Sequence, residues 1–301
     1  MKKKFPFSKI IVFSRDEFKQ HQLSQELNSS KLRFWIGDIR DKDRLEFALR
    51  NVDYIVHAAA LKQVPAAEYN PTEFIKTNVI GAQNLIECSL KTNVKALIAL
   101  STDKACSPIN LYGATKLCAD KLFVSANKLA GSNKKRFSVV RYGNVLGSRG
   151  SVLSKFLETK RENKPFPITD FNMTRFNILL KEAIEMVLWS LIYSKGGEIL
   201  IPKLKSYNII DFAKAVSANA KFIKVGVREG EKIHEEMISE ADSYYTYEYG
   251  KYFAIIPDYI KKINFRKKKL KRIKNIGQSY NSNLNPKLSV KDLRKIIKSI
   301  S

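Results

Sequence analysis

Short runs of β-branched and aromatic residues alternate, in the first half of the chain, with segments in which apolar positions recur every three or four residues. The runs are KIIVF (9–13), LRFWI (32–36), YIVHA (54–58), ALIALS (96–101) and FSVVRY (137–142). Runs of this length and composition are typical of buried strands, and the helical spacing between them indicates crossover helices. The pattern therefore predicts an α/β fold with a doubly wound parallel sheet.

The clearest helical pattern lies between the third and fourth runs. Its apolar positions are Phe74, Ile75, Val79, Ala82, Leu85, Ile86 and Leu90. This spacing gives one broad apolar face, which is typical of a helix packed on a sheet. After about residue 150 the pattern is more mixed, with a helix expected over 180–193 and strands near 198–201 and 222–227. We therefore expect the sheet to be followed by a smaller C-terminal lobe.

Composition restricts where the chain acts and what it binds. Of its 301 residues 44% are hydrophobic, and no run of eighteen apolar residues could span a bilayer. The N-terminal stretch is too short for a signal peptide. The few cysteines and histidines have no zinc-ligand spacing; they are Cys88, Cys106, Cys118, His21, His57 and His234. We expect a cytoplasmic protein with neither a membrane association nor a bound metal.

The chain is strongly basic, with 54 Lys and Arg against 29 Asp and Glu and a net charge of +25. Its densest basic run is KKINFRKKKLKRIK, at 261–274. Such a run can bind nucleic acid or another anionic surface, or it can be a solvated, lysine-biased face. Because the lysines are spread along the whole chain and no nucleic-acid motif accompanies them, we favour the solvated face and expect no nucleic-acid partner.

Acid, base and hydroxyl side chains gather where the fourth run ends. Asp103 and Lys104 follow that predicted strand directly, and Tyr112 and Lys116 come next in YGATK. The carboxyl ends of parallel strands are where such sheets bind ligands. Tyr and Lys four residues apart share a helix face, so the ammonium can make the phenol a usable general base. A single Y-x-x-x-K is common by chance, and an Asp-Lys pair can be a surface ion pair or a helix cap; the position after a strand favours a site.

Six ordered segments resemble the inverting UDP-N-acetylglucosamine 4,6-dehydratases, which are extended short-chain dehydrogenases/reductases. They are HAAALK (57–62), LSTDKA (100–105), INLYGATK (109–116), RYGNVLGSRGSV (141–152), ITDFNMTRF (168–176) and REGEKIHEEMI (228–238). The resemblance covers roughly residues 8–260. Membrane-attached retaining relatives usually carry Met in place of Tyr112. Tyrosine therefore points to the enzyme that begins pseudaminic acid synthesis for flagellin glycosylation.

The resemblance implies a role for each catalytic residue. Tyr112, aided by Lys116, takes the C4 hydroxyl proton while hydride passes from C4 to a nicotinamide. Lys104 then removes the C5 proton and Asp103 protonates the departing C6 hydroxyl, after which the hydride returns to C6 and reprotonation inverts C5. For Lys104 to act as this base, its pKa must be lowered by several units through burial or a nearby cation such as Lys116.

Cofactor and substrate contacts are also implied by the resemblance. Ser14 and Arg15 follow the first run, where Arg suits the 2′-phosphate of NADP, and Asp38 resembles the adenine contact; Tyr112 and Lys116 complete the cofactor site. The implied contacts to UDP-N-acetylglucosamine are Lys62, Asn144, Arg149, Arg175, Arg228 and Glu231. The arginines suit a diphosphate, although a surface salt bridge explains any one of them alone. We expect residues 1–150 to form the dinucleotide-binding domain, residues 151–301 the substrate-binding lobe and tail, and the protein to be a homo-oligomer.

The glycine-rich turn of the family is the main departure. The first glycine in the sequence is Gly37, so no G-x-x-G-x-x-G precedes the first visible run. Gly143, Gly147 and Gly150 mimic such a loop but match the substrate and nicotinamide loop. We therefore expect a Rossmann-like fold that lacks its N-terminal strand-turn-helix and binds dinucleotide poorly by itself. Gln63 and Glu229 replace residues common in the family without removing a catalytic charge.

Two alternatives remain at this point. The first is a retaining dehydratase or an epimerase on another UDP-sugar. Tyr112 argues against the former, and the Asp103–Lys104 pair argues against an epimerase, which needs no C5 deprotonation. The second is a catalytically dead family member that acts as a binding or assembly protein, which the absence of a glycine-rich turn supports.

Overall fold

A seven-stranded sheet forms the centre of the computed structural model, which describes residues 7–131, 135–148, 150–265 and 269–300. Three parallel strands at one edge are joined by a fourth parallel strand and then by antiparallel ones. In order across the sheet they are β15 (Lys271–Arg272), β13 (Thr246–Tyr249), β14 (Tyr252–Ile255), β9 (Ile199–Pro202), β5 (Arg136–Tyr142), β4 (Ala96–Thr102) and β3 (Tyr54–His57). The predicted α/β class with a parallel sheet is confirmed.

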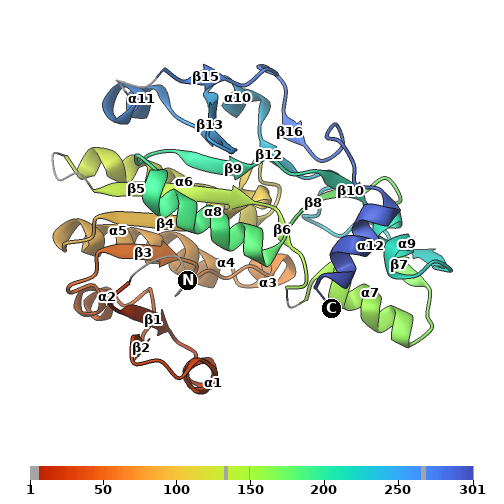
Figure 1. The fold of residues 1–301 in the computed structure, drawn as a ribbon, viewed down its shortest axis with the longest axis horizontal. Helices are drawn as coiled ribbons and strands as arrows, with labels where there is room; N and C mark the ends of the chain where they lie inside the picture. The colour runs from red at the N-terminus through yellow and green to blue at the C-terminus, as the bar shows by residue number, and fades with distance from the viewer. Residues whose placement is uncertain (1–6, 132–134, 149, 266–268, 301) are drawn as a thin grey trace.

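Helices cover both faces of this sheet. Figure 1 shows α8 (Leu180–Tyr193) crossing in front of β4 and β5, with α5 and α6 behind them. The predicted helix between the third and fourth runs is continuous from α4 to α5 and includes one π-helical segment. The helical elements between β2 and β5 are α2 (Lys42–Ala48), α3 (Val64–Tyr69), α4 (Pro71–Phe74), η1 (Ile75–Ile80), α5 (Gly81–Lys91), η2 (Asp103–Ala105) and α6 (Leu111–Leu129).

The first two strands form a sheet of their own. β1 (Ile10–Ser14) pairs in parallel with β2 (Leu32–Ile36) through the crossover helix α1 (Glu17–Leu27). Among the described strands, β3 pairs with β4 alone, and β1 pairs with β2 alone. The β1–β2 unit lies below the β3 edge of the large sheet in Figure 1. The two sheets are therefore not joined by hydrogen bonds between their described strands.

A second apolar core supports the smaller lobe. Its largest fully buried side chains include Phe156, Ile168 and Phe212, which lie apart from the main core around β4 and β5. Its elements, at the right of Figure 1, are β6 (Asn144–Val145), α7 (Val152–Arg161), β7 (Phe166–Ile168), β8 (Thr174–Ile178), β10 (Ser206–Asn208), α9 (Ile209–Val216), β11 (Phe222–Lys224) and α12 (Val290–Lys298). The elements of the described chain not yet named are β12 (Glu236–Ile238), α10 (Glu240–Ser243), α11 (Asp258–Asn264) and β16 (Tyr280–Asn281).

The boundary at residue 150 remains a prediction. A lobe with its own core does follow that residue, but β9, β13, β14 and β15 also come after it and belong to the large sheet. The chain thus returns from the smaller lobe to the large sheet. The expected strand near 222–227 is shorter than the pattern suggested and ends at Lys224.

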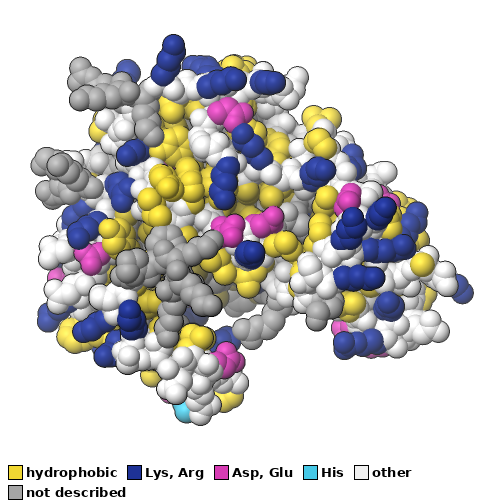
Figure 2. Space-filling model, in the orientation of Figure 1, with side chains coloured by type: hydrophobic (Ala, Val, Ile, Leu, Met, Phe, Trp, Pro, Cys, Tyr) yellow, Lys and Arg dark blue, Asp and Glu magenta, His cyan; other side chains and the backbone are white. Residues whose placement is uncertain are grey.

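Basic side chains are spread over the visible face of the molecule, including the lobe that contains α7 and α12 (Figure 2). Part of the predicted basic run, 266–268, lies outside the described residues. Within the described ranges no helix is long and apolar enough to cross a bilayer. The same ranges contain no cluster of three or more His, Cys, Asp or Glu side chains that could hold a metal.

A buried carboxyl at the start of β9 makes stability depend on pH. Burial raises the pKa of Glu198 from 4.5 to about 7, against the opposing effect of the Lys195 amide, which donates to its carboxyl at 2.7 Å. The folded chain therefore binds more protons here than the unfolded chain does. This contribution to stability is complete below pH 4.5 and is lost as pH rises through about 7.

We expect the Glu198→Gln variant to lose this pH dependence. The shift corresponds to roughly 3 kcal/mol between pH 4.5 and 7. His57 acts in the opposite direction, because burial and nearby Lys116 lower its pKa to about 3. The measurement is therefore the difference in free energy of unfolding between wild type and variant, from urea titrations at pH 5 and pH 7.5. An equal difference at the two pH values would contradict the assignment.

Candidate active site

The residues after β4 fold into a tight turn that presents Asp103 and Lys104. The Thr102 hydroxyl donates to Asp103 Oδ1 at 2.9 Å and accepts from the Lys104 amide at 3.4 Å. Asn110 then caps α6, because its side-chain oxygen accepts from the Gly113 amide at 2.8 Å. The cap fixes where the helix begins, and Tyr112 and Lys116 therefore lie in its first turns.

A cavity of about 520 Å³ opens at the carboxyl ends of β3, β4 and β5. Its walls come from both lobes, since residues after β4 and β5 face residues from β8 and from the loop before β12. The residues predicted from sequence that line it are Lys62, Lys104, Tyr112, Lys116, Asn144, Arg175, Arg228 and Glu231. The structure therefore brings most of the predicted catalytic and substrate residues to one place.

Other predicted residues lie elsewhere. Asp103 is completely buried beside Lys104 and does not line the cavity. Ser14 is the last residue of β1, and Arg15 and Asp38, which follow β1 and β2 of the separate sheet, form an ion pair at 3.4 Å. They too are absent from the cavity walls, and Arg149 lies outside the described residues. Their predicted roles remain predictions.

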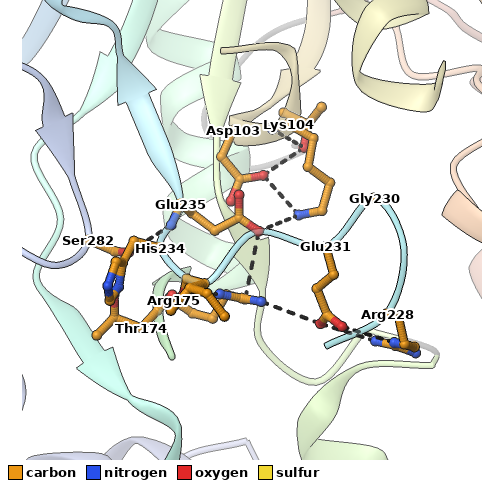
Figure 3. Close-up of polar contacts among 12 residues, drawn as sticks. Asp103, Lys104, Thr174, Arg175, Arg228, Gly230, Glu231, His234, Glu235 and Ser282 are labelled. Carbon is orange, nitrogen blue, oxygen red and sulfur yellow. Dashed lines mark hydrogen bonds and ion pairs between the residues drawn. The ribbon is translucent and has the colours of Figure 1, made fainter. Parts of the chain in front are cut away.

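Lys104 is held between two buried carboxylates. Its Nζ lies 3.2 Å from Asp103 Oδ1 and 3.2 Å from Glu235 Oε1 (Figure 3). Burial by itself would lower the pKa of Lys104, but the charges of Asp103 and Glu235 outweigh it and raise that pKa above its ordinary value. The lowered pKa that a base at C5 requires is therefore not present in this arrangement, in which a second carboxylate, Glu235, joins Asp103 beside the lysine.

Tyr112 and Lys116 are both buried but respond to different neighbours. Burial raises the pKa of Tyr112 to about 12, and the cation that most strongly opposes this effect is Lys104. Lys116 donates from Nζ to the Leu100 carbonyl at 2.8 Å, and burial lowers its pKa. In the described structure, Lys104 therefore supplies the charge that sequence reasoning assigned to Lys116.

The predicted substrate arginines are paired with acids along one wall of the cavity. Arg175 is fixed by hydrogen bonds to the Thr174 and Ile233 carbonyls at 2.8 and 2.9 Å, and lies 3.4 Å from Glu231. Arg228 binds the same carboxylate at 3.0 Å. Figure 3 shows this row of alternating charges leading from Lys104 to Arg228. An anionic ligand would compete with Glu231 for both arginines.

Sequence reasoning missed two buried features of the site. One is Glu235, for which the quoted HEEMI segment gave a signal: an acid directly before a short apolar strand. The other is a buried ion pair in which Arg141 NH2 lies 3.1 Å from Asp120 Oδ2. Asp120 also accepts from the Ser101 hydroxyl at 2.9 Å, which links α6 to the end of β4. The Arg141–Asp120 pair leaves no such local pattern in the sequence.

Gly113 sets the distance between α6 and the catalytic turn. A Cβ at this position would lie 2.3 Å from the Lys104 carbonyl oxygen, which is backbone and cannot move aside cheaply. We expect Gly113→Ala to displace Tyr112 relative to Lys104, to lower stability by about 1–3 kcal/mol and to reduce turnover at least about tenfold. The measurements are denaturant unfolding and steady-state rates, with exposed Lys121→Ala on the same helix as the control. An unchanged kcat and KM would show that α6 can shift to accommodate the added methyl group without displacing Tyr112.

The fold and the site together define a class. A parallel α/β sheet with Lys104, Tyr112 and Lys116 lining a cavity at its strand ends, and with Asp103 buried beside Lys104, defines a Rossmann-like protein of the extended short-chain dehydrogenase/reductase type. The chain belongs to the family described as polysaccharide biosynthesis protein, whose model matches residues 2–257.

Comparison with known proteins narrows this class. The chain is 51% identical to a Campylobacter jejuni protein (serotype O:23/36, strain 81-176) named UDP-N-acetylglucosamine 4,6-dehydratase (inverting), over 96% of this chain and 89% of the relative. The X-ray structure of Pen from Bacillus thuringiensis matches with a TM-score of 0.87 and 35% identity, covering 97% of this chain and 90% of that one. The resemblance stated from the six sequence segments is confirmed.

A more distant structure shares the fold. It is DesIV, a dTDP-glucose 4,6-dehydratase from Streptomyces venezuelae solved with NAD and TYD bound. Its TM-score is 0.68 at 22% identity, covering 76% of this chain and 78% of that one. The doubly wound architecture is thus shared well beyond the range of close sequence similarity.

Proposed function

We propose that this chain carries out 4,6-dehydration of UDP-N-acetylglucosamine with inversion at C5, giving a UDP-4-keto-6-deoxy-hexosamine. The observation that carries the proposal is the arrangement of Lys104 and Tyr112 in one cavity, above the buried carboxyl of Asp103 and opposite two arginines. The name of the C. jejuni relative supports both the substrate and the stereochemistry. The activity is that of a hydro-lyase.

The place of this reaction in a biosynthetic pathway is proposed from the resemblance alone. The reaction would be the first step of pseudaminic acid synthesis for flagellin glycosylation. We propose a cytoplasmic homo-oligomer; the free thiols of Cys88, Cys106 and Cys118 fit a reducing compartment. Exposed apolar side chains on α8, such as Leu180 and Ile192, offer a surface for contact between copies.

A nicotinamide dinucleotide is the proposed cofactor, with NADP preferred. The described residues fit its nicotinamide half, because Tyr112 and Lys116 line the cavity and the buried Lys116 ammonium can donate to a ribose hydroxyl. At the other end, the Arg15 side chain is 53% exposed, which leaves its charge accessible to a 2′-phosphate. The cofactor would supply the oxidation at C4 and return the two electrons at C6. The NAD in the DesIV structure supports a dinucleotide of this kind.

The chain's own residues move the protons. Tyr112 accepts the C4 hydroxyl proton as the phenolate, and the nearby Lys104 cation favours this anion against burial, which raises the pKa of Tyr112 to about 12. Once C4 is a ketone, the C5 hydrogen is acidic, and Lys104 can accept it as the neutral amine after its ammonium has passed one proton to the Asp103 carboxylate, whose Oδ1 lies 3.2 Å away. Asp103 donates a proton to the C6 hydroxyl, which leaves as water. Its Oδ2 is buried with no hydrogen-bond partner among the described residues, so this oxygen is available to carry that proton.

The experiment that tests the function is ¹H NMR of UDP-N-acetylglucosamine incubated with the protein and a trace of NADP in D₂O. We expect a 4-keto-6-deoxy sugar nucleotide that carries deuterium at C5 and has the inverted configuration there. Retained configuration would identify a retaining dehydratase, and conversion to the C4 epimer without loss of water would identify an epimerase. Either result would reject the proposal.

Arg15→Asp tests the preference for NADP. The change replaces an attractive charge at the 2′-phosphate by a repulsive one, so we expect the affinity for NADP to fall at least about tenfold more than the affinity for NAD. Fluorescence titration with both reduced cofactors measures the ratio of the two dissociation constants. Arg33→Asp, on the exposed side of β2, is the matched control. A ratio that does not change would exclude Arg15 as the group that recognises the phosphate.

A further inference from the structure

The backbone of Glu235 is clamped from both sides. Its amide donates to the Ser282 hydroxyl at 2.9 Å, and its carbonyl accepts from the Ser282 amide at 2.8 Å. The Ser282 hydroxyl also lies 2.7 Å from the Thr174 hydroxyl on β8. Because three segments hold this one residue, the direction of the Glu235 side chain is fixed by the fold.

The Glu235 carboxylate links the catalytic lysine to the wall of the cavity. Oε1 lies 3.2 Å from Lys104 Nζ and 3.7 Å from Arg175 Nε, and the side chain is only 3% exposed (Figure 3). Oε2 is buried with no hydrogen-bond partner among the described residues. A buried carboxylate is costly unless paired, and the two cations beside Glu235, Lys104 and Arg175, both line the cavity.

We propose that Glu235 is a positioning residue for the dehydration, which holds the Lys104 nitrogen at the floor of the cavity and controls its protonation. The inference rests on the proposed function, in which Lys104 removes the C5 proton. An ammonium has no lone pair and cannot accept that proton. Glu235 stabilises the ammonium, so its charge governs how much neutral amine is present at a given pH.

The groups facing Lys104 come from every element around it. Asp103 precedes it in the turn, Tyr112 lies on α6, Arg175 on β8, and Glu235 precedes β12. The two carboxylates raise the pKa of Lys104, and burial and Arg175 lower it. With Gln in place of Glu235, only Asp103 and, more weakly, Tyr112 would remain to stabilise the ammonium against burial and Arg175. The pKa of Lys104 must then fall.

The first test reads Lys104 directly and needs no turnover. Competitive acetylation with acetic anhydride, followed by peptide mass spectrometry across a pH series, gives the midpoint at which Lys104 becomes reactive. We expect Glu235→Gln to lower that midpoint by about one pH unit or more. Glu235→Asp, which keeps the charge, should stay near wild type. Glu236→Gln is the matched control, since that carboxylate binds the Ser107 hydroxyl at 2.6 Å instead.

The second test is kinetic. Arg175 keeps its two carbonyl partners when Glu235 is changed. We therefore expect Glu235→Ala to lower the plateau of kcat, reached where Lys104 is neutral, about tenfold to a hundredfold because the amine is no longer held in place, while KM stays within about threefold. In Glu235→Gln the limb of the kcat–pH profile that reports Lys104 should move to lower pH. A structural role alone would lower the melting temperature without moving this limb.

The outcomes separate this inference from the proposed function. An acetylation midpoint that is the same in Glu235→Gln and wild type would overturn the role of Glu235, whatever reaction the protein catalyses. A wild-type kcat and pH profile in the same variant would overturn it as well. If wild type forms no keto sugar, the proposed function fails, and the acetylation midpoints alone decide whether Glu235 controls Lys104.

Discussion

Replacing Lys104 by Met is expected to reduce dehydration about a hundredfold to ten-thousandfold, because the C5 proton would have no acceptor. The same change removes the cation between Asp103 and Glu235, whose carboxylates would then be buried without it. We therefore also expect a loss of stability, which thermal unfolding can measure. Rates should be compared at a temperature where the variant is folded. Lys95→Met, at an exposed position paired with Asp53, is the control.

Asp103→Asn and Tyr112→Phe should reduce turnover over the same range for different reasons. The amide cannot protonate the C6 hydroxyl, and the phenyl ring cannot accept the C4 proton. Tyr112→Phe should block the first oxidation, so no deuterium should enter C5 in D₂O. Asp103→Asn should still allow that exchange, because it acts after C4 is oxidised. Wild-type turnover in any of the three variants would remove that residue from the mechanism.

The largest expected gain in stability, NADP binding and turnover comes from adding a segment before Ser8. Among the described strands, β1 and β3 belong to different sheets, and each has one edge without a strand partner. We expect a homologous strand, glycine-rich turn and helix, about 25 residues in all, to pair with these edges and to supply amides for a pyrophosphate. The fused protein should have a higher melting temperature and should bind NADP and dehydrate the sugar nucleotide better than the 301-residue chain.

The control for this fusion is the same segment with its sequence scrambled. Added length alone would then leave binding and stability unchanged. Isothermal titration with NADP and product analysis by NMR measure the two gains. The expectation fails if the 301-residue chain itself binds NADP stoichiometrically and turns over at ordinary enzymatic rates, since other residues would then hold the pyrophosphate.

Local patterns predicted the elements well. The five apolar runs coincide with β1 to β5 within two residues, and the helix expected at 180–193 is α8. These segments were predictable because a strand or helix buried on a sheet must show its own periodicity. The placement of Lys104 and Tyr112 beyond the carboxyl end of β4 could also be predicted, because it follows from the topology of a parallel sheet.

Features that depend on pairing over long sequence distances were not predictable. Glu235 reaches Lys104 across 131 positions, and together with Asp103 it raises the pKa of that lysine. The antiparallel strands β13 to β15, which join the large sheet, lie in the sequence between β11 and α12 of the smaller lobe. Both features become visible only in the tertiary structure, because a single sequence does not indicate which distant residues are in contact.

The buried pair of Arg141 and Asp120 limits how this site can diversify. Arg141 donates to the Met237 carbonyl at 3.1 Å as well as binding Asp120, so it connects β5, α6 and β12 behind the reacting groups. Loss of Arg141 leaves the buried Asp120 without its cation, and loss of Asp120 leaves Arg141 with Asp242 at 3.8 Å as its remaining ion-pair partner; breaking a buried pair costs about 3–5 kcal/mol. A lineage could replace the pair only through a destabilised intermediate or by two changes together. Relatives that acquire new sugar specificities should therefore vary the cavity wall while inheriting these two residues as a unit.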